Sequence, residues 1–231
     1  VVAHMIKSFV CVCTGNKYPP SYVNKLYSMV DRNSTDVQFY VITDSHKSGF
    51  DQHIKQIVIT PLYKSWWNKV HMFRDDIGLE GTVIFMDLDV VILKNIDHLW
   101  EFEGDAFVII QDFNRCRIQD YQVRNSSVMK FYAGNEVDMW HKFKNNPDKI
   151  QSSYQGDQNY VTAERKNCCI WPFEWIMSYK WELGLMKEDQ KRANDKLRNS
   201  AIPQECCVAV FHGKPDPGDI KHDPVIIEHW R

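Results

Sequence analysis

Residues 83–95 read VIFMDLDVVILKN and place two carboxylates, Asp87 and Asp89, inside an otherwise almost unbroken apolar run. A run of this kind is typical of a strand that is buried on both faces in the middle of a parallel sheet. Side chains two residues apart in a strand face the same way, so we expect Asp87 and Asp89 to project together and Leu88 to point to the opposite face. The stretch therefore predicts a central strand that carries a pair of acidic side chains.

Two like charges this close together in an apolar setting repel each other and are costly unless a cation offsets them. A divalent metal ion is the simplest such cation, and oxygen ligands suit Mg²⁺ or Mn²⁺. The alternative is a strand end that turns out to solvent with two hydrated acids. We favour the metal, because apolar residues approach the pair from both sides.

Strand and helix patterns alternate on both sides of this stretch. Before it, the pattern predicts a strand over 6–13 with a turn at 14–17, a helix over 21–33, strands over 37–42 and 54–59, and a helix over 65–77 capped by Gly78. After it, the pattern predicts a strand over 106–113, a helix over 136–146, a charged surface segment over 180–199 and a last strand over 206–211. This alternation predicts an α/β fold with a mostly parallel central sheet flanked by helices, and with ligands at the carboxyl ends of the strands.

The length of the chain, its net charge and its apolar runs limit the classes of protein and partner. The 231 residues suit one domain, predicted over 5–231, with residues 1–4 interpreted as a cloning remnant ahead of Met5. The 28 basic and 30 acidic residues leave a net charge of -2, which argues against nucleic acid or an anionic membrane as the main partner. No apolar run reaches the ~20 residues that a membrane span needs.

The cysteine usage indicates a compartment. Seven cysteines are an odd number, and the doublets Cys168-Cys169 and Cys206-Cys207 lie in apolar or strand-like contexts, as buried thiols do. We therefore expect a soluble cytoplasmic protein with reduced thiols.

The ordered set of motifs resembles the A-type-fold (GT-A) glycosyltransferases, especially the glycogenin and galactosyltransferase-like family with its viral and bacterial relatives. The resemblance is carried by VCTGNKYPPSYVNKL at 12–26, WWNKVHMF at 66–73, the Asp-x-Asp stretch running into KNIDHLWEF, NSSVM at 125–129, GDQ at 156–158 and HGKP at 212–215. It implies a single-domain, Rossmann-like GT-A fold. It also implies metal-dependent transfer of a sugar from a nucleotide diphosphate sugar, a UDP-sugar favoured, to a hydroxyl of a glycan, protein or small molecule, with retention of configuration.

The same resemblance assigns roles to single residues. Asp87, Asp89 and His212 would bind Mn²⁺ or Mg²⁺, with Asp87 sharing the ion or contacting the ribose. Asp157 and Gln158 would lie beside the reacting carbon. The donor would be bound by Thr14, Gly15, Lys17, Asp44, Lys69, Asp87, Leu88, Asp89, Asn125, Ser126, Gly213 and Lys214. The compact HGKP departs from the longer His-x-x-Gly-x-x-Lys-Pro form of the family, and NSSVM departs from its Asn-Ala-Gly pattern.

Two other functions stay open on the sequence. An apolar strand followed by Asp-x-Asp-x-Val also resembles the nucleophile motif of haloacid-dehalogenase-type phosphatases, with Asp87 as nucleophile and Asp89 as general acid. That family carries the motif on its first strand, whereas strands and helices precede it here. The third reading is a catalytically silent module that binds a nucleotide sugar or a glycan. The donor base, the donor sugar and the acceptor are not encoded in a readable pattern.

Overall fold

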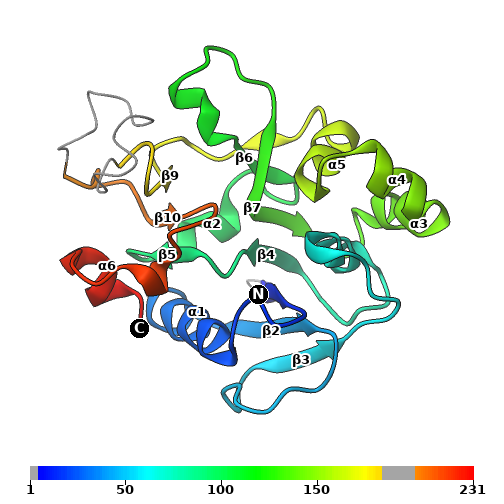
Figure 1. Ribbon diagram of the computed structural model, residues 1–231, viewed down its shortest axis with the longest axis horizontal. Coiled ribbons are helices and arrows are strands. Elements are labelled where there is room, and N and C mark those ends of the chain that lie inside the picture. The colour runs from blue at the N-terminus through cyan, green and yellow to red at the C-terminus, as the bar shows by residue number, and fades with distance from the viewer. Residues whose placement is uncertain (1–4, 184–200) are drawn as a thin grey trace.

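The computed structural model describes residues 5–183 and 201–231, so the predicted remnant 1–4 and most of the charged segment 180–199 lie outside the described residues. The described chain forms two sheets (Figure 1). In spatial order, the seven-stranded sheet contains β3 (Lys55–Val58), β2 (Val37–Thr43), β1 (Lys7–Cys13), β4 (Thr82–Met86), β7 (Arg124–Tyr132), β6 (Val108–Gln111) and β8 (Cys169–Ile170). The three-stranded sheet contains β5 (Val90–Ile92), β10 (Val208–Val210) and β9 (Ile176–Ser178).

The helices connect and cover these strands. They are α1 (Pro20–Asn33), the 3₁₀ helix η1 (Ser65–Phe73), α2 (Asp97–Glu101), the 3₁₀ turn η2 (Phe113–Cys116), α3 (Val137–Asn145), α4 (Pro147–Ser153), α5 (Asp157–Glu164), the 3₁₀ turn η5 (Pro217–Asp219) and α6 (Pro224–His229). Figure 1 shows α3, α4 and α5 grouped on one side of the molecule and α1 with α6 on another. Every helix in the described part of the chain is too short or too polar to span a lipid bilayer.

The large sheet is parallel in its first half and reverses at β7. Strands β3, β2, β1 and β4 run parallel to one another, and β8 runs parallel to β6. Strand β7 lies antiparallel to both β4 and β6, so it begins at the edge where β1, β2 and β4 end. The predicted α/β class with a mostly parallel central sheet is therefore confirmed, and β7 brings its first residues to the carboxyl edge of the parallel strands.

The prediction that residues 83–95 form one strand is wrong. Strand β4 ends at Met86 in the large sheet, and β5 begins at Val90 in the small one. Backbone bonds hold the crossing, because the Asp87 N–H donates to the Ser127 carbonyl (2.9 Å) and the Phe211 N–H donates to the Asp89 carbonyl (2.9 Å). The run is apolar because both strands are fully buried, and the two aspartates lie at the break between them.

The helix predicted over 65–77 is shorter and tighter than expected. It is a 3₁₀ helix that ends at Phe73, and Gly78 does not cap it. The buried Asn68 explains part of this difference, since its side chain bonds to the backbone N–H and carbonyl of Tyr63 and to the Ser65 carbonyl. A side chain that competes for backbone partners in this way disfavours a regular α-helix.

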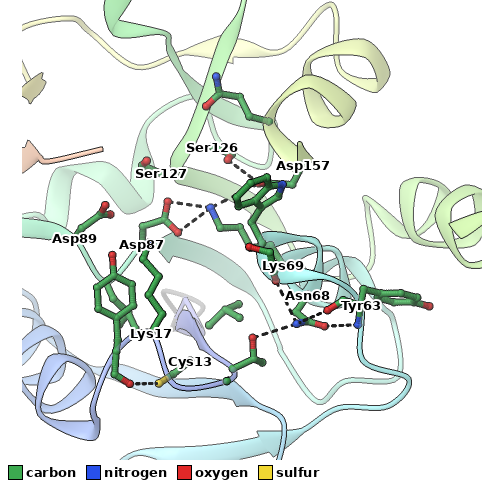
Figure 2. A pocket seen from close by; sticks show the side chains of 18 of the residues that line it. Cys13, Lys17, Tyr63, Asn68, Lys69, Asp87, Asp89, Ser126, Ser127 and Asp157 are labelled. Atoms are coloured by element: carbon green, nitrogen blue, oxygen red, sulfur yellow. Dashed lines mark hydrogen bonds and ion pairs between the residues drawn. The ribbon is translucent and has the colours of Figure 1, made fainter. Parts of the chain in front are cut away.

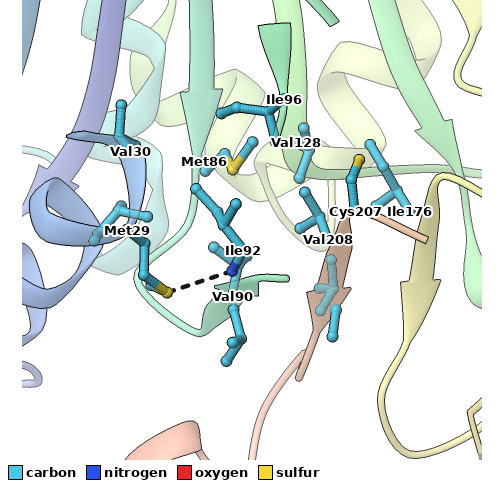
Figure 3. Packing of buried hydrophobic residues seen from close by; sticks show 14 of the residues in the cluster. Met29, Val30, Met86, Val90, Ile92, Ile96, Val128, Ile176, Cys207 and Val208 are labelled. Carbon is cyan, nitrogen blue, oxygen red and sulfur yellow. Dashed lines mark hydrogen bonds between the residues drawn. The ribbon is translucent and has the colours of Figure 1, made fainter. Parts of the chain in front are cut away.

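Alternate side chains of the central strands divide the core into two clusters. Phe9, Ile84 and Met86 belong to the cluster that also contains α1, β5 and β10. Val83 and Phe85 point the other way, into the cluster that contains η1, α3 and α5. Figure 3 shows the first cluster, where side chains of α1 meet those of the small sheet. This two-sided burial fixes both sheet faces around the end of β4.

All seven thiols are free. Cys206 and Cys207 are fully buried, as the sequence predicts, because they precede β10 inside the first cluster. Cys168 and Cys169 are only half-buried, because they lie around β8 at the edge of the large sheet, so the prediction for that doublet is wrong.

His71 provides a test of the second cluster through pH. Its imidazole is buried, donates from Nε2 to the Pro61 carbonyl (2.9 Å), and has its pKa lowered to about 4 by burial. In the unfolded chain the imidazole has its ordinary pKa of about 6.5, so below that pH the unfolded state binds the proton first and stability falls towards pH 4.

We expect His71→Gln to remove this part of the pH dependence. The difference in unfolding free energy between wild type and variant should be about 2 kcal/mol larger at pH 7 than at pH 4.5. Urea unfolding at the two pH values measures it, with His141→Gln, an exposed residue of α3, as the control. Equal pH dependence in wild type and His71→Gln would contradict the assignment.

Candidate active site

A cleft of about 590 Å³ opens at the carboxyl edge of the parallel strands. Segments that follow β1, β2, β4 and β10 meet there with η1 and with the first residues of β7 and α5. Figure 2 shows the charged side chains that project into it. The lining residues that the sequence predicts are Thr14, Gly15, Lys17, Asp44, Lys69, Asp87, Leu88, Asp89, Asn125, Ser126, Asp157, Gln158 and His212.

A lysine between two carboxylates forms the charged centre of the cleft. The Lys69 ammonium lies 2.8 Å and 2.9 Å from the two oxygens of Asp87 and 3.6 Å from Oδ2 of Asp157 (Figure 2). The Ser126 hydroxyl donates to the same Asp157 oxygen at 2.8 Å. Burial raises the pKa of Asp87 to about 6, since the nearby carboxylate of Asp89 adds to the effect and Lys69 only partly opposes it.

Lys69 carries a positive charge in the cleft. Burial by itself lowers the pKa of this lysine, but the carboxylates of Asp157 and Asp87 outweigh it and raise the pKa above its ordinary value. The ammonium therefore stays protonated across the physiological range and neutralises part of the acidic cluster.

Asp89 turns to a different partner from Asp87. Its side chain is buried, and its Oδ2 accepts from the Gly213 N–H at 3.2 Å. Asp87 and Asp89 both line the cleft, as predicted, but they do so from the break between β4 and β5 and not from within a strand. Leu88 also contributes to the lining, and its side chain is buried in the first core cluster.

His212 lines the cleft from the end of β10. Its Nε2 lies 2.6 Å from the Ser178 hydroxyl, and its ring stacks on Phe113 and meets Trp181 edge-on. Burial and, to a smaller extent, the ammonium of Lys180 lower the pKa of the imidazole to about 3. His212 is therefore neutral at physiological pH.

One end of the cleft is built from the segments after β1 and β2. Oδ2 of Asp44 accepts from the Gly15 N–H at 3.0 Å, and Oδ1 pairs with Lys47 at 3.0 Å. Burial tends to raise the pKa of Asp44, but the hydrogen bonds from Lys47 and Gly15 lower it below the usual range. Thr14 accepts through Oγ1 from the Asn68 amide at 3.1 Å. These bonds give this end a fixed set of polar groups.

Gly213 and Lys214, which the sequence predicts for the donor site, are not among the residues that line the cleft. The Lys214 ammonium is exposed and pairs with Asp216 and Asp219, both at 2.9 Å. Its neighbour Gly213 contributes a backbone N–H to Asp89. Lys214 turns away because two carboxylates of its own loop are within reach, which the compact HGKP spacing did not reveal.

The three predicted metal ligands share one cleft without forming a closed set. Within 5–183 and 201–231, no three His, Cys, Asp or Glu side chains are gathered closely enough to hold a metal ion. Asp87 is engaged with Lys69, Asp89 with Gly213, and His212 with Ser178. Metal binding accordingly stays a prediction from the sequence.

Sequence reasoning missed several residues of the cleft, among them Tyr18, Tyr63, Trp66, Asn68 and Ser127. Asn68 had a usable signal, because an amide inside an apolar helical pattern needs partners when it is buried. Tyr18 had none, yet in the described part of the chain its buried hydroxyl has no hydrogen-bond partner. Burial and the carboxylate of Asp89 raise the pKa of Tyr18, so it stays a neutral donor.

The Lys69–Asp87 pair predicts a measurable coupling. Lys69→Met should lower the unfolding free energy by about 2–3 kcal/mol in metal-free buffer, because it leaves two buried carboxylates without their cation. Adding Asp87→Asn to that variant should restore part of the loss, as a double-mutant cycle by urea unfolding would measure. The control is Lys149→Met at an exposed position of α4. Equal stability of Lys69→Met and wild type would contradict the coupling.

Comparison with known proteins reveals the fold to which the chain belongs. A scan against protein families and a search of curated proteins each found no match. Solved structures do match, among them the galactosyltransferase LgtC in complex with donor and acceptor sugar analogs (TM-score 0.64, 14% identity, 91% of this chain and 88% of that one). The others include the glycosyltransferase GlyE of Streptococcus pneumoniae TIGR4 (0.68, 10%, 93% and 56%) and the bifunctional glycosyltransferase WbbM (0.64, 9%, 100% and 50%). The chain therefore has the GT-A fold of these glycosyltransferases, as the sequence predicts.

Proposed function

We propose that the chain is a metal-dependent glycosyltransferase. It would move a sugar from a nucleotide diphosphate sugar, a UDP-sugar favoured, to a hydroxyl of a glycan, protein or small molecule, with retention of configuration. The observation that carries this proposal is the single cleft that gathers Asp44, Asp87, Asp89, Asp157 and His212 at the carboxyl edge of a sheet with the GT-A fold. Ligands of open α/β sheets bind at this edge.

The nucleoside end of the donor would lie over the segments after β1 and β2. Asp44 offers carboxylate oxygens to base or ribose donors, and Lys17 adds a positive charge on the same rim. Lys69 would contact the diphosphate from the other side. Gly213 and Lys214 follow His212, and Lys214 would exchange its present partners, Asp216 and Asp219, for the diphosphate.

The chemistry of the cleft suits a divalent cation. Asp87 and Asp89 supply the hard oxygen ligands that Mn²⁺ and Mg²⁺ prefer. His212 is neutral because burial lowers its pKa to about 3, and neutral imidazole is the form that binds metals. Burial raises the pKa of Asp87, with a smaller contribution from the Asp89 carboxylate, so a cation bound beside it would favour its charged form. When bound, the ion would stabilise negative charge on the departing diphosphate.

Asp157 is proposed to act beside the reacting carbon. Its Oδ2 is held by Ser126 and approached by Lys69, which fixes the carboxylate at the start of α5. From there it would position the acceptor, stabilise positive charge on the sugar ring or act as base. Ser126, which the family resemblance assigns to donor binding, donates its hydroxyl hydrogen to Asp157, so we give it the role of orienting that carboxylate. The Gln158 amide donates to Asp112 at 3.3 Å and is oriented by it.

The phosphatase alternative has less support. It needs Asp87 as a free nucleophile, but both oxygens of Asp87 contact Lys69, and the motif follows the fourth strand of the chain instead of the first. The silent binding module differs from the proposed enzyme only in turnover, so activity separates the two.

Manganese-dependent hydrolysis of UDP-sugars in the absence of acceptor tests the proposal. We expect activity with Mn²⁺ that Asp89→Asn lowers by about a thousandfold, since the developing diphosphate charge then loses its main stabilisation. Asp75→Asn, at an exposed position, is the control. NMR of the first sugar product reads its configuration. Release of phosphate from simple phosphomonoesters in place of UDP would refute the transferase.

Thermal unfolding tests binding apart from turnover. UDP with Mn²⁺ at about 100 times its Kd should stabilise the folded chain by about 2.7 kcal/mol, seen as a rise in Tm. Asp89→Asn should lose the part of the shift that needs the metal. A full shift with no hydrolysis or transfer by wild type would favour the silent module, and no shift with any nucleotide would argue against a donor site.

A further inference from the structure

Two large apolar side chains are exposed on the rim of the cleft. Leu62 is 54% exposed and Trp66 is 51% exposed, and both line the cleft. An indole left half in water at the mouth of a cleft is a candidate for ligand contact.

The backbone holds Trp66 in this position. The next two side chains, Trp67 and Asn68, are both 4% exposed. Trp67 stacks on Phe143 with ring centroids 5.4 Å apart, and the Asn68 side chain bonds back to Tyr63 and Ser65, which precede Trp66. Ser65 adopts a left-handed conformation (φ 53°) that turns the chain just before the indole. The indole is therefore presented by a fixed support.

The indole lies at the end of the cleft where we propose the chemistry takes place. It packs on Gly156, where an added Cβ would be only 2.8 Å from the indole Nε1. Gly156 immediately precedes Asp157 and Gln158 at the start of α5. The exposed indole therefore lies next to the segment that carries Asp157 and Gln158.

The chemistry of this rim suits a neutral sugar ring. An indole offers a broad apolar face and one N–H donor, and in the described chain no acceptor engages that N–H of Trp66. One face of a pyranose is likewise lined by C–H groups, while its hydroxyls project from the edge. Four carboxylates and two ammonium groups line the cleft, which disfavours an anionic acceptor.

We propose that Trp66 and Leu62 form the acceptor subsite and that a neutral pyranose stacks on the indole. The inference rests on the proposed transferase function and adds the substrate class of its second site. Trp66 then determines the affinity for acceptor, and the donor is held by the groups deeper in the cleft.

The test compares transfer with hydrolysis of one UDP-sugar in Mn²⁺. The acceptors are methyl glucoside, methyl galactoside, lactose and maltose. For Trp66→Ala, the ratio of transfer to hydrolysis should fall and the acceptor KM should rise about tenfold or more, whereas Trp66→Phe should retain most transfer. Tyr132→Ala is the matched control, because Tyr132 is an exposed aromatic at the opposite end of β7.

Each other outcome overturns the inference. An unchanged acceptor KM in Trp66→Ala would show that the indole does not bind the acceptor. An equal fall in hydrolysis and transfer would assign it to the donor instead. If transfer occurred only to sugars that carry an alkyl or aryl group, Trp66 and Leu62 would bind that apolar group and not the sugar ring. If the folded wild type did not turn over the UDP-sugar at all, the proposed transferase function itself would be wrong. This failure can be told apart from failure of the acceptor inference, because hydrolysis of the donor is measured before the acceptors are compared.

Discussion

The two carboxylates at the end of β4 impose the constraint on which the rest of the site depends. Asp87 and Asp89 lie where the chain leaves the large sheet for the small one; Asp89 is buried, and the Asp87 side chain is only 22% exposed. Buried charge requires compensation, and each aspartate obtains it from a different segment. Lys69 of η1 pairs with Asp87, and the backbone after β10 donates to Asp89. The acidic pair thereby ties two distant segments to one point.

These two segments belong to opposite faces of the sheet. Helix η1 packs in the cluster with α3 and α5, whereas β10 packs in the cluster with α1 and β5. Because alternate side chains of β4 enter both clusters, the end of β4 is held from both sides. The cleft therefore needs both cores to be packed, and its polar groups are oriented before any ligand binds. Ser126 on Asp157 and Gly15 on Asp44 extend the same arrangement along the cleft.

Much of the architecture could be read from local pattern. The strand–turn–helix order at the start predicts β1 and α1, and the carboxyl-edge rule brings Asp44, Asp87 and Thr14 to one place. The interruption between β4 and β5 could not be read, because an apolar run looks the same whether it crosses one sheet or two. The 3₁₀ character of η1 depends on where the Asn68 amide finds partners, and that depends on the folded chain around it.

The sequence by itself determined that two acids lie in an apolar setting, that strands and helices alternate, and that the motifs follow the order of the GT-A glycosyltransferases. The comparison with solved structures confirms the GT-A fold. Only the tertiary structure decided that Asp87 pairs with Lys69 while Asp89 turns to Gly213, that Lys214 stays with Asp216 and Asp219, and that Trp66 is exposed beside Asp157. Charge and exposure depend on which groups from distant segments come within a few ångströms, and such distances are set by packing and not by spacing along the chain.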